Sequence, residues 1–270
     1  MKWINPIKLL LLPVVLFALA SCKKYPSPGW HCPPVPQCPV ASIVKTNESL
    51  PFCYVQRNYM NVPVKLEYYE RSVAGAIYEG VLDVHYQGRK LYLTDVVTQD
   101  TVLAVKLDEC GRPVQSFFAE TMHLPGVPVS SRYFYNAQGR LSRYESIEGD
   151  LGSAQNFSYD QRGNLLKISA AGDLAFEYTY DYARPVEKGT VTYAEVRERR
   201  MNPLTMLEYL GHIDLMPRNL RLTSRSWIGD YQTASFAYSN HVFSGQRLVS
   251  YEGDGTFALT WSCQKTPPRK

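Results

Sequence analysis

Hydrophobic and polar residues alternate in short runs over most of the chain from about residue 50 onward. In VLDVHY (81–86), KLYLTDVV (90–97) and TVLAVKL (101–107), apolar residues recur at every second position. A period of two places these side chains on one face of a β-strand. The turn signals GR, TQD and ECGR separate or follow these runs at short intervals, which is typical of an antiparallel meander and not of βαβ units.

The same pattern resumes towards the C-terminus, after an interruption that predicts a helix. In the interruption, Asn202 is placed to cap a helix, Pro203 to begin it and Gly211 to follow its end. We interpret this helix as packed on a sheet face or plugging its open end, with a ligand-gating lid as the alternative. The strand-like runs that follow it are RLTSRSW (221–227), YQTASFAYS (231–239), QRLVSYE (246–252) and FALTWS (257–262).

Two stretches, YFYNAQGRLSRY (133–144) and FSYDQRGNLLKI (157–168), are copies of one unit. Tyr135 aligns with Tyr159 at an offset of 24 residues, and both copies fit aromatic-x-Tyr-[Asn/Asp]-x-x-Gly-[Arg/Asn]-Leu. An Asn or Asp side chain can accept hydrogen bonds from the amides that follow it, and Gly supplies the positive φ that closes a hairpin loop. The predicted turn residues are Asn136 with Gly139, Asp160 with Gly163 and, in a degenerate copy, Asp108 with Gly111.

The predicted fold class is therefore mainly β. We expect β-hairpin repeats to form one large twisted or curved sheet, in one or two layers, with a single short helix near residues 203–210.

The N-terminal sequence MKWINPIKLLLLPVVLFALASC has the pattern of a cleaved export signal. Lys2 and Lys8 precede an apolar run, Leu9 to Leu19. This run is too short to span a bilayer as a permanent helix. An ordinary secretory signal would explain this pattern and would leave Cys22 as a plain thiol.

The segment Leu19-Ala20-Ser21-Cys22 resembles the lipobox of bacterial lipoproteins. The resemblance implies that residues 1–21 are removed and that Cys22 carries acyl chains, which together anchor a protein firmly. The residue after the cysteine is Lys and not Asp, which favours the outer membrane of a Gram-negative cell. The membrane is thus an expected partner, through the lipid anchor.

The repeated unit adds a second family resemblance to that of the lipobox. Tyr-Asp-x-x-Gly-Asn-Leu (159–165) resembles the YD repeat of the RHS family of bacterial cell-surface and toxin-shell proteins. The whole arrangement is similar to uncharacterised envelope lipoproteins with RHS-like repeats. The two good copies span only residues 133–168, and RHS proteins carry many more, so the resemblance implies a β architecture and not an encapsulating role.

Composition limits the partners and the number of domains. Removal of residues 1–21 leaves 249 residues with 27 basic and 25 acidic side chains, a net charge of +2. A near-neutral chain lacks the electrostatic footprint of a nucleic-acid binder, so none is expected. We place a proline-rich tether at 22–45 and a single β-rich domain at 46–265.

Five cysteines besides Cys22 remain, and the cell envelope permits disulfides. Cys32 and Cys38 flank PPVPQ, where a disulfide would close a small loop. A metal clip that includes His31 is the alternative, although no second ligand pair follows.

Two further cysteines, Cys53 and Cys263, lie near the ends of the folded region and are a second candidate disulfide. That pairing would leave Cys110 as the odd thiol, but sequence alone does not decide the connectivity.

Recognisable catalytic and cofactor motifs are lacking. The five histidines are dispersed, and the sequence contains neither a Gly-x-Ser-x-Gly elbow nor a glycine-rich phosphate loop after a strand. We expect no cofactor and no metal site. Carboxylates cluster in YESIEGDLG (144–152) and YEGDG (251–255), which we interpret as solvated hairpin tips. A carboxylate-dependent glycoside hydrolase and a calcium site at Asp254 are the alternatives.

Aromatic residues of the repeat strands are the main candidates for a binding face. Either both faces of these strands are covered, or one face is exposed and stacks on sugar rings or partner chains. The residues concerned are Tyr133, Tyr135, Phe157, Tyr159, Phe176, Tyr178 and Tyr180.

Three functional hypotheses follow. The first is a lipid-anchored, non-catalytic β module that binds a protein or glycan at the cell surface or has a structural role. The second is a periplasm-facing carrier that holds an apolar ligand on a curved sheet under the helix. The third is a hydrolase built on carboxylates.

Overall fold

The computed structural model describes residues 40–46, 51–71, 77–119, 128–186, 203–253 and 255–262. These residues form a nearly all-β antiparallel meander with one short helix, α2 (Pro203–Leu210). The helix begins at Pro203 and ends before Gly211, as the sequence predicts.

The strands follow one another along the whole described chain. Their bounds are β1 Val40–Lys45, β2 Pro51–Arg57, β3 Pro63–Arg71, β4 Ile77–Gln87, β5 Lys90–Asp95, β6 Thr101–Leu107, β7 Pro113–Phe118, β8 Val129–Tyr135, β9 Leu141–Glu148, β10 Leu151–Tyr159, β11 Leu165–Ala170, β12 Asp173–Pro185, β13 Asn219–Ile228, β14 Tyr231–Ala237, β15 Ser239–Ser244, β16 Arg247–Glu252 and β17 Thr256–Trp261.

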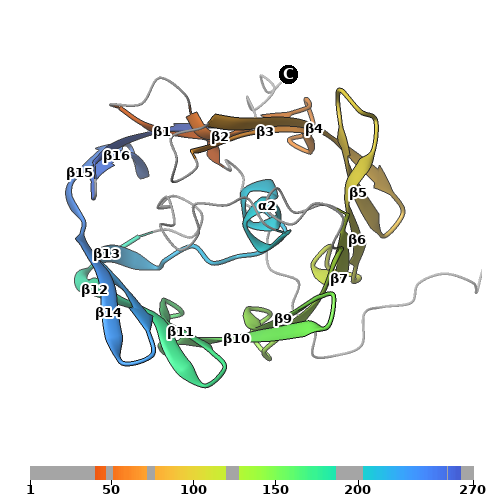
Figure 1. Cartoon of the computed structure of the whole chain (residues 1–270). Coiled ribbons are helices and arrows are strands. Elements are labelled where there is room, and N and C mark those ends of the chain that lie inside the picture. Colours follow the sequence, from red (N-terminus) through yellow and green to blue (C-terminus); the bar gives the residue numbers. More distant parts are fainter. Residues whose placement is uncertain are drawn as a thin grey trace, which may run out of the picture. The chain divides into compact units, whose positions relative to one another are not determined.

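Pairing of neighbouring strands bends this meander into a nearly closed, barrel-like sheet (Figure 1). Each strand from β1 to β13 pairs antiparallel with the next one in the chain, and so do β15 with β16 and β16 with β17. The last strand, β17, returns to pair with β1. Closure of a sheet satisfies backbone groups that a free edge would leave unpaired.

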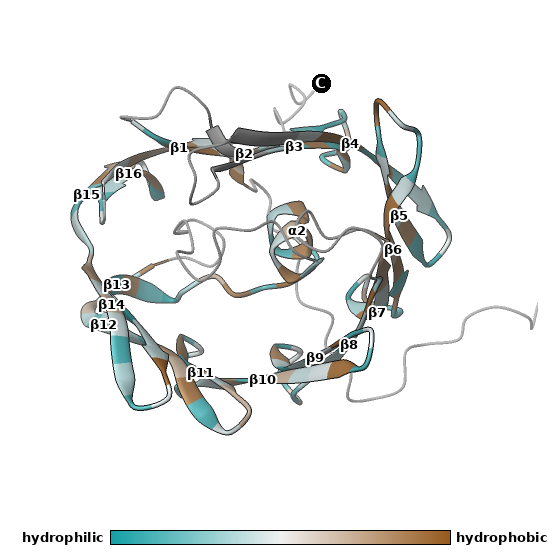
Figure 2. Cartoon of the chain, viewed as in Figure 1, coloured by the Kyte–Doolittle hydropathy of each residue, from teal (hydrophilic) through white to brown (hydrophobic). Residues whose placement is uncertain are grey.

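The interior of the barrel is filled by apolar side chains. Helix α2 lies inside the ring of strands (Figure 1), and its residues Leu204, Met206, Leu207 and Leu210 belong to one hydrophobic cluster with inward side chains from β2 to β12. Leu207 has no exposed surface. Figure 2 shows hydrophobic residues on α2 and hydrophilic residues over much of the hairpins. The helix is therefore the centre of the core, which agrees with the predicted plugging or packing role.

Four hairpin turns share one hydrogen-bond pattern. In each, the side-chain oxygen of the first residue accepts two backbone N–H groups, and the N–H of the fourth residue donates to the first residue's carbonyl. The turns are Asn58–Val62, Asp108–Arg112, Asn136–Arg140 and Asp160–Asn164. The fourth residue has positive φ, at 63° for Asn61 and 94° for Gly163. Because Asn tolerates this conformation, the turn at Asn58 lacks the glycine that marks the other three.

Tyrosine hydroxyls link each repeat to the one before it. Tyr135 Oη donates to the carbonyl of Pro113 at 2.8 Å, and Tyr159 Oη donates to that of Leu141 at 2.8 Å. The guanidinium of Arg112 also lies over the ring of Tyr135, 4.5 Å from its centroid. The Tyr of the repeated unit is thus explained by contacts between neighbouring hairpins.

The sheet begins earlier than the sequence indicates. Strand β1 occupies the end of the segment interpreted as a tether, where Ile43 is fully buried and the strand pairs with both β2 and β17. Local sequence hides this strand because its burial follows from pairing with the C-terminal strand. The signal peptide, Cys22 and the rest of the tether lie outside the described residues.

Candidate binding site at the seam of the sheet

The aromatic residues that the sequence offers as a binding face lie in the interior. Tyr133, Phe157, Tyr178 and Tyr180 are 2–5% exposed. Tyr135, Tyr159 and Phe176 are partly buried and pack against the same cluster. These seven side chains therefore build the core and do not form an exposed face. The strand alternates as expected, however, because Phe134 points outward and is 43% exposed.

The seam is the place where the chain passes from β14 to β15. Strand β14 pairs with β13 and β15 pairs with β16, and Tyr238 alone connects the two strands. The N–H of Tyr238 donates to the carbonyl of Leu222 at 2.9 Å. Asn240 then adopts a positive φ of 47°, which redirects the chain. At the seam, the β13–β14 pair is therefore joined to the β15–β16 pair by the backbone of the chain through Tyr238.

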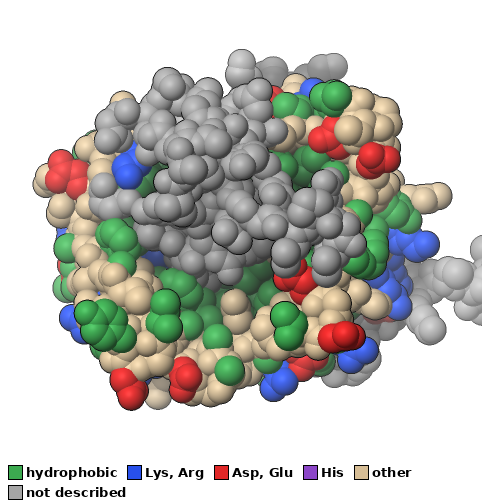
Figure 3. Space-filling view, in the orientation of Figure 1, with side chains coloured by type: hydrophobic (Ala, Val, Ile, Leu, Met, Phe, Trp, Pro, Cys, Tyr) green, Lys and Arg blue, Asp and Glu red, His purple; other side chains and the backbone are tan. Residues whose placement is uncertain are grey.

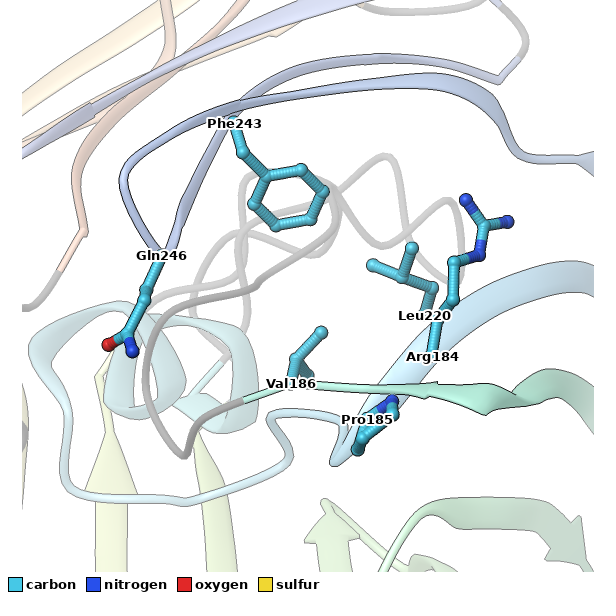
Figure 4. Close-up of a pocket in the computed structure, with 6 residues that line it drawn as sticks. All are labelled: Arg184, Pro185, Val186, Leu220, Phe243 and Gln246. Carbon is cyan, nitrogen blue, oxygen red and sulfur yellow. The ribbon is translucent and has the colours of Figure 1, made fainter.

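A pocket of about 360 Å³ opens at this seam. Figure 4 shows Phe243, Leu220 and Val186 pointing towards a common space. The lining residues are Arg184 and Pro185 at the end of β12, Val186 just after it, Leu220 of β13, Phe243 of β15 and Gln246 of the following turn. A mainly apolar lining with a few polar groups is the usual composition of a small-molecule site.

The charged side chain in the pocket lining is Arg184, which forms an ion pair with Asp181. Arg184 Nε donates to Asp181 Oδ2 at 2.6 Å, and this hydrogen bond is the main reason why the pKa of Asp181 is lowered. On β15, burial lowers the pKa of His241, and the positive charge of Arg184 lowers it further. The guanidinium of Arg184 therefore lies at the pocket and near enough to His241 to favour the neutral form of that histidine.

Buried amides hold the start of β13 in place beside the pocket. Asn164 Oδ1 accepts the N–H groups of Arg218 and Asn219 at 2.7 and 3.0 Å. Its Nδ2 donates to Asp160 Oδ2 and to Asn219 Oδ1. Since Asn164 and Asn219 are almost fully buried, these bonds satisfy groups that would otherwise be costly. The repeated turn at Asp160 thereby positions Leu220.

Two carboxylates of the sequence clusters have separate partners. Glu145 bonds to Arg143 at 2.8 Å on β9, and Glu252 accepts from Asn240 Nδ2 at 2.7 Å near the seam. Asp254 lies outside the described residues. Among the residues that are described, no group of three or more His, Cys, Asp or Glu side chains could hold a metal ion.

The cysteines differ from the predicted arrangement. Cys53 is a free thiol with 2% exposure, and burial raises its pKa far above the usual range. Cys110, which a Cys53–Cys263 pairing would leave as the odd thiol, is disulfide-bonded. Cys32, Cys38 and Cys263 lie outside the described residues. Cys53 is buried because the pairing of β2 with its neighbours directs this side chain into the barrel core.

Sequence reasoning did not find the pocket residues. Arg184, Leu220 and Phe243 belong to three different strands, and nothing in their local patterns distinguishes them from other hairpin residues. One available signal was the stretch 231–246, which contains no Asp, Glu, Lys or Arg. In the structure this uncharged stretch forms β14 and β15, the two strands on either side of the seam.

The fold is similar to that of a solved structure described as a porin-like protein from Bacteroides uniformis. The TM-score is 0.58 at 14% sequence identity, and the match covers 85% of this chain and 99% of that chain. No family model and no curated protein matches the sequence. The chain therefore has a porin-like β fold, and at this identity the similarity concerns the fold alone. Among the described residues, no helix is long and apolar enough to cross a membrane.

Proposed function

We propose that this protein is a lipid-anchored lipoprotein of the cell envelope, in the outer membrane of a Gram-negative cell, and that its barrel is a non-catalytic binding or structural module. The observation that carries the proposal is the distribution of polarity across the wall. Leu91, Leu103 and Leu141 point inward and are 0–1% exposed. Figure 3 shows charged side chains around the periphery and hydrophobic ones in the visible part of the interior.

Transmembrane barrels have the opposite polarity, with an apolar band facing lipid and a polar lumen. Here, outward positions of the wall carry Lys90, Lys106 and Arg132, all exposed. This arrangement supports a barrel that faces water on its outside. Membrane attachment then depends on the lipobox cysteine, Cys22, and the YD-like repeats serve to build the wall.

The experiment is replacement of the anchor cysteine in the full-length chain. We expect the wild-type protein to incorporate labelled palmitate and to sediment with membranes. Cys22→Ser should lose the label and stay folded in solution without detergent. Ser21→Ala, which keeps a small residue before the cysteine, is the matched control and should behave as wild type. A Cys22→Ser protein that still sediments with membranes would contradict the proposal.

The seam pocket favours a second candidate function, a carrier of an apolar ligand. Its volume lies within the range of small-molecule sites, and Pro185, Val186 and Phe243 give it an apolar wall. Native mass spectrometry of the same soluble Cys22→Ser protein separates the two candidates. A carrier retains a co-purifying apolar ligand, whereas the module proposed first yields only the mass of the chain.

A further inference from the structure

Five neighbouring strands, β5 to β9, present a continuous row of residues on the outer face of the wall. In the strand register, each residue of this row stands directly opposite the next one on the neighbouring strand; from β5 to β9 they are Tyr92, Ala104, Phe117, Ser130 and Ile147. These positions face outward, because residues flanking them along the strands, such as Leu91, Leu103 and Phe118, are buried. We call this set the apolar row.

Large and small side chains alternate along the apolar row. Phe117 is 48% exposed and Ile147 is 50% exposed, while Tyr92 is partly exposed. Between these side chains stand Ala104 and Ser130, which leave room above the sheet. Since strands lie about 4.8 Å apart, the large side chains recur at about 9.6 Å. The row is therefore a periodic platform of exposed rings and methyl groups.

A second row, one pleat away along the same strands, is basic. It consists of Lys90, Lys106, Gln115 and Arg132, which are also direct cross-strand neighbours. All four are exposed, and the two rows are roughly 7 Å apart. We call this set the basic row.

Cations outnumber acids along the basic row, whose next position in register, opposite Arg132, is Glu145. No ion pair within the described part of the chain involves Lys90, Lys106 or Arg132, and Glu145 bonds to Arg143. Lys90 stands directly opposite Lys106. Like charges in this position destabilise a sheet. A bound polyanion would remove this repulsion.

We propose that the outer face of β5 to β9 binds an extended acidic polysaccharide. The C–H faces of sugar rings would pack on Tyr92 and Phe117, whose ring faces carry partial negative charge. The acidic groups would lie over Lys90, Lys106 and Arg132. A linear polymer matches this linear, periodic platform. This inference rests on the proposed binding role and names its ligand class.

The test measures binding of polygalacturonate to the full mature chain in detergent, with dextran as the uncharged polymer. We expect binding to polygalacturonate alone, with an affinity that falls as salt rises. Phe117→Ala should weaken it about tenfold, the loss expected for an exposed aromatic contact at the centre of a site. Lys90→Gln with Lys106→Gln should weaken it at least as much and reduce its salt dependence.

Matched controls separate the site from general effects. Tyr231→Ala removes an aromatic side chain that is 77% exposed on β14, and Lys167→Gln removes an exposed cation on β11; both should bind as wild type. Circular dichroism confirms that the variants are folded.

Several results would overturn the inference. Binding that is absent, that is equal for dextran, or that survives the row variants would do so, as would binding to anionic phosphatidylglycerol vesicles in place of the polysaccharide. In each case, retention of the wild-type chain on membranes through Cys22 would still support the proposed anchoring.

Discussion

Individual residues show most directly how the barrel wall is joined to its filled interior. His212, just after α2, contacts the wall at two places. Its Nδ1 is 2.8 Å from the carbonyl of Gly111, in the turn between β6 and β7, and its Nε2 is 3.0 Å from Oη of Tyr86 on β4. Arg57 on β2 donates to the carbonyls of Tyr209 and Leu210 at the end of the helix. A cation at this end also complements the helix dipole.

The surroundings of His212 lead to a pH prediction. Burial lowers its pKa, and the nearby charge of Arg57 lowers it further, although the hydrogen bond to Gly111 acts in the opposite direction. A lowered pKa means that the unfolded state takes up the proton first. The stabilising effect is therefore complete above about pH 6.5 and is lost as the pH falls towards the folded pKa.

We expect the free energy of unfolding to fall by up to about 1.4 kcal/mol per pH unit for this proton below pH 6.5. His212→Gln should flatten that decrease, leaving the part that comes from His241, whose pKa is also lowered. Urea titrations at pH 7.5 and pH 5 measure both slopes, with His85→Gln, an exposed histidine on β4, as the control. Equal slopes in wild type and His212→Gln would show that His212 is not buried in its neutral form.

At the scale of elements, the recurring unit is a hairpin turn closed by a glycine with positive φ, and the surroundings of that glycine differ between copies. Gly163 has φ 94°, and a Cβ built there would collide with the guanidinium of Arg140. That guanidinium lies 5.5 Å from the ring centroid of Tyr159. Gly111 in the equivalent turn has φ 75° but has open space around it. The two turns share a backbone requirement and differ in packing.

Alanine substitution at these two glycines separates strain from contact. Gly111→Ala should cost about 1–2 kcal/mol of unfolding free energy, the cost of a left-handed conformation for a residue with a Cβ. Gly163→Ala should cost more, because Arg140 must also leave its place over Tyr159. Denaturant unfolding of both variants measures the difference. Equal losses would mean that the contact with Arg140 adds nothing to stability.

For the whole molecule, the decisive property is that the apolar face of the sheet is turned inward onto α2. Leu207 is at the centre of that core with no exposed surface, whereas Leu151, at the start of β10 beside the hairpin tip, is 79% exposed. We expect Leu207→Ala to lower the unfolding free energy by about 2–5 kcal/mol through lost burial and a cavity.

The same substitution at Leu151 should change stability by less than about 0.5 kcal/mol in water. Thermal and urea unfolding of the detergent-free Cys22→Ser protein carrying each change provides the comparison. If Leu151→Ala were as damaging as Leu207→Ala, the tip of the β9–β10 hairpin would be packed against something, and the contrast in burial between the two leucines would be wrong.

The sequence by itself determined the local elements of this protein. Alternation predicted the strands around residues 81–107 and 221–262, and the Asn202–Gly211 signals predicted α2 with its bounds. The Asp, Asn and Gly of the repeat predicted three of the four shared turns. These features depend on backbone geometry within a few residues, so the local sequence pattern is enough to predict them.

Only the tertiary structure decided which face is inside, how the sheet closes and where a ligand would meet it. The burial of Tyr133 and Tyr178, the pairing of β1 with β17 and the pocket at Leu220 and Phe243 all join residues that are distant in sequence. A two-residue period states that a strand has an apolar face but not what covers it. Coverage depends on non-local pairing and on the helix that fills the ring, and these decided that the tyrosines of the repeat build the core.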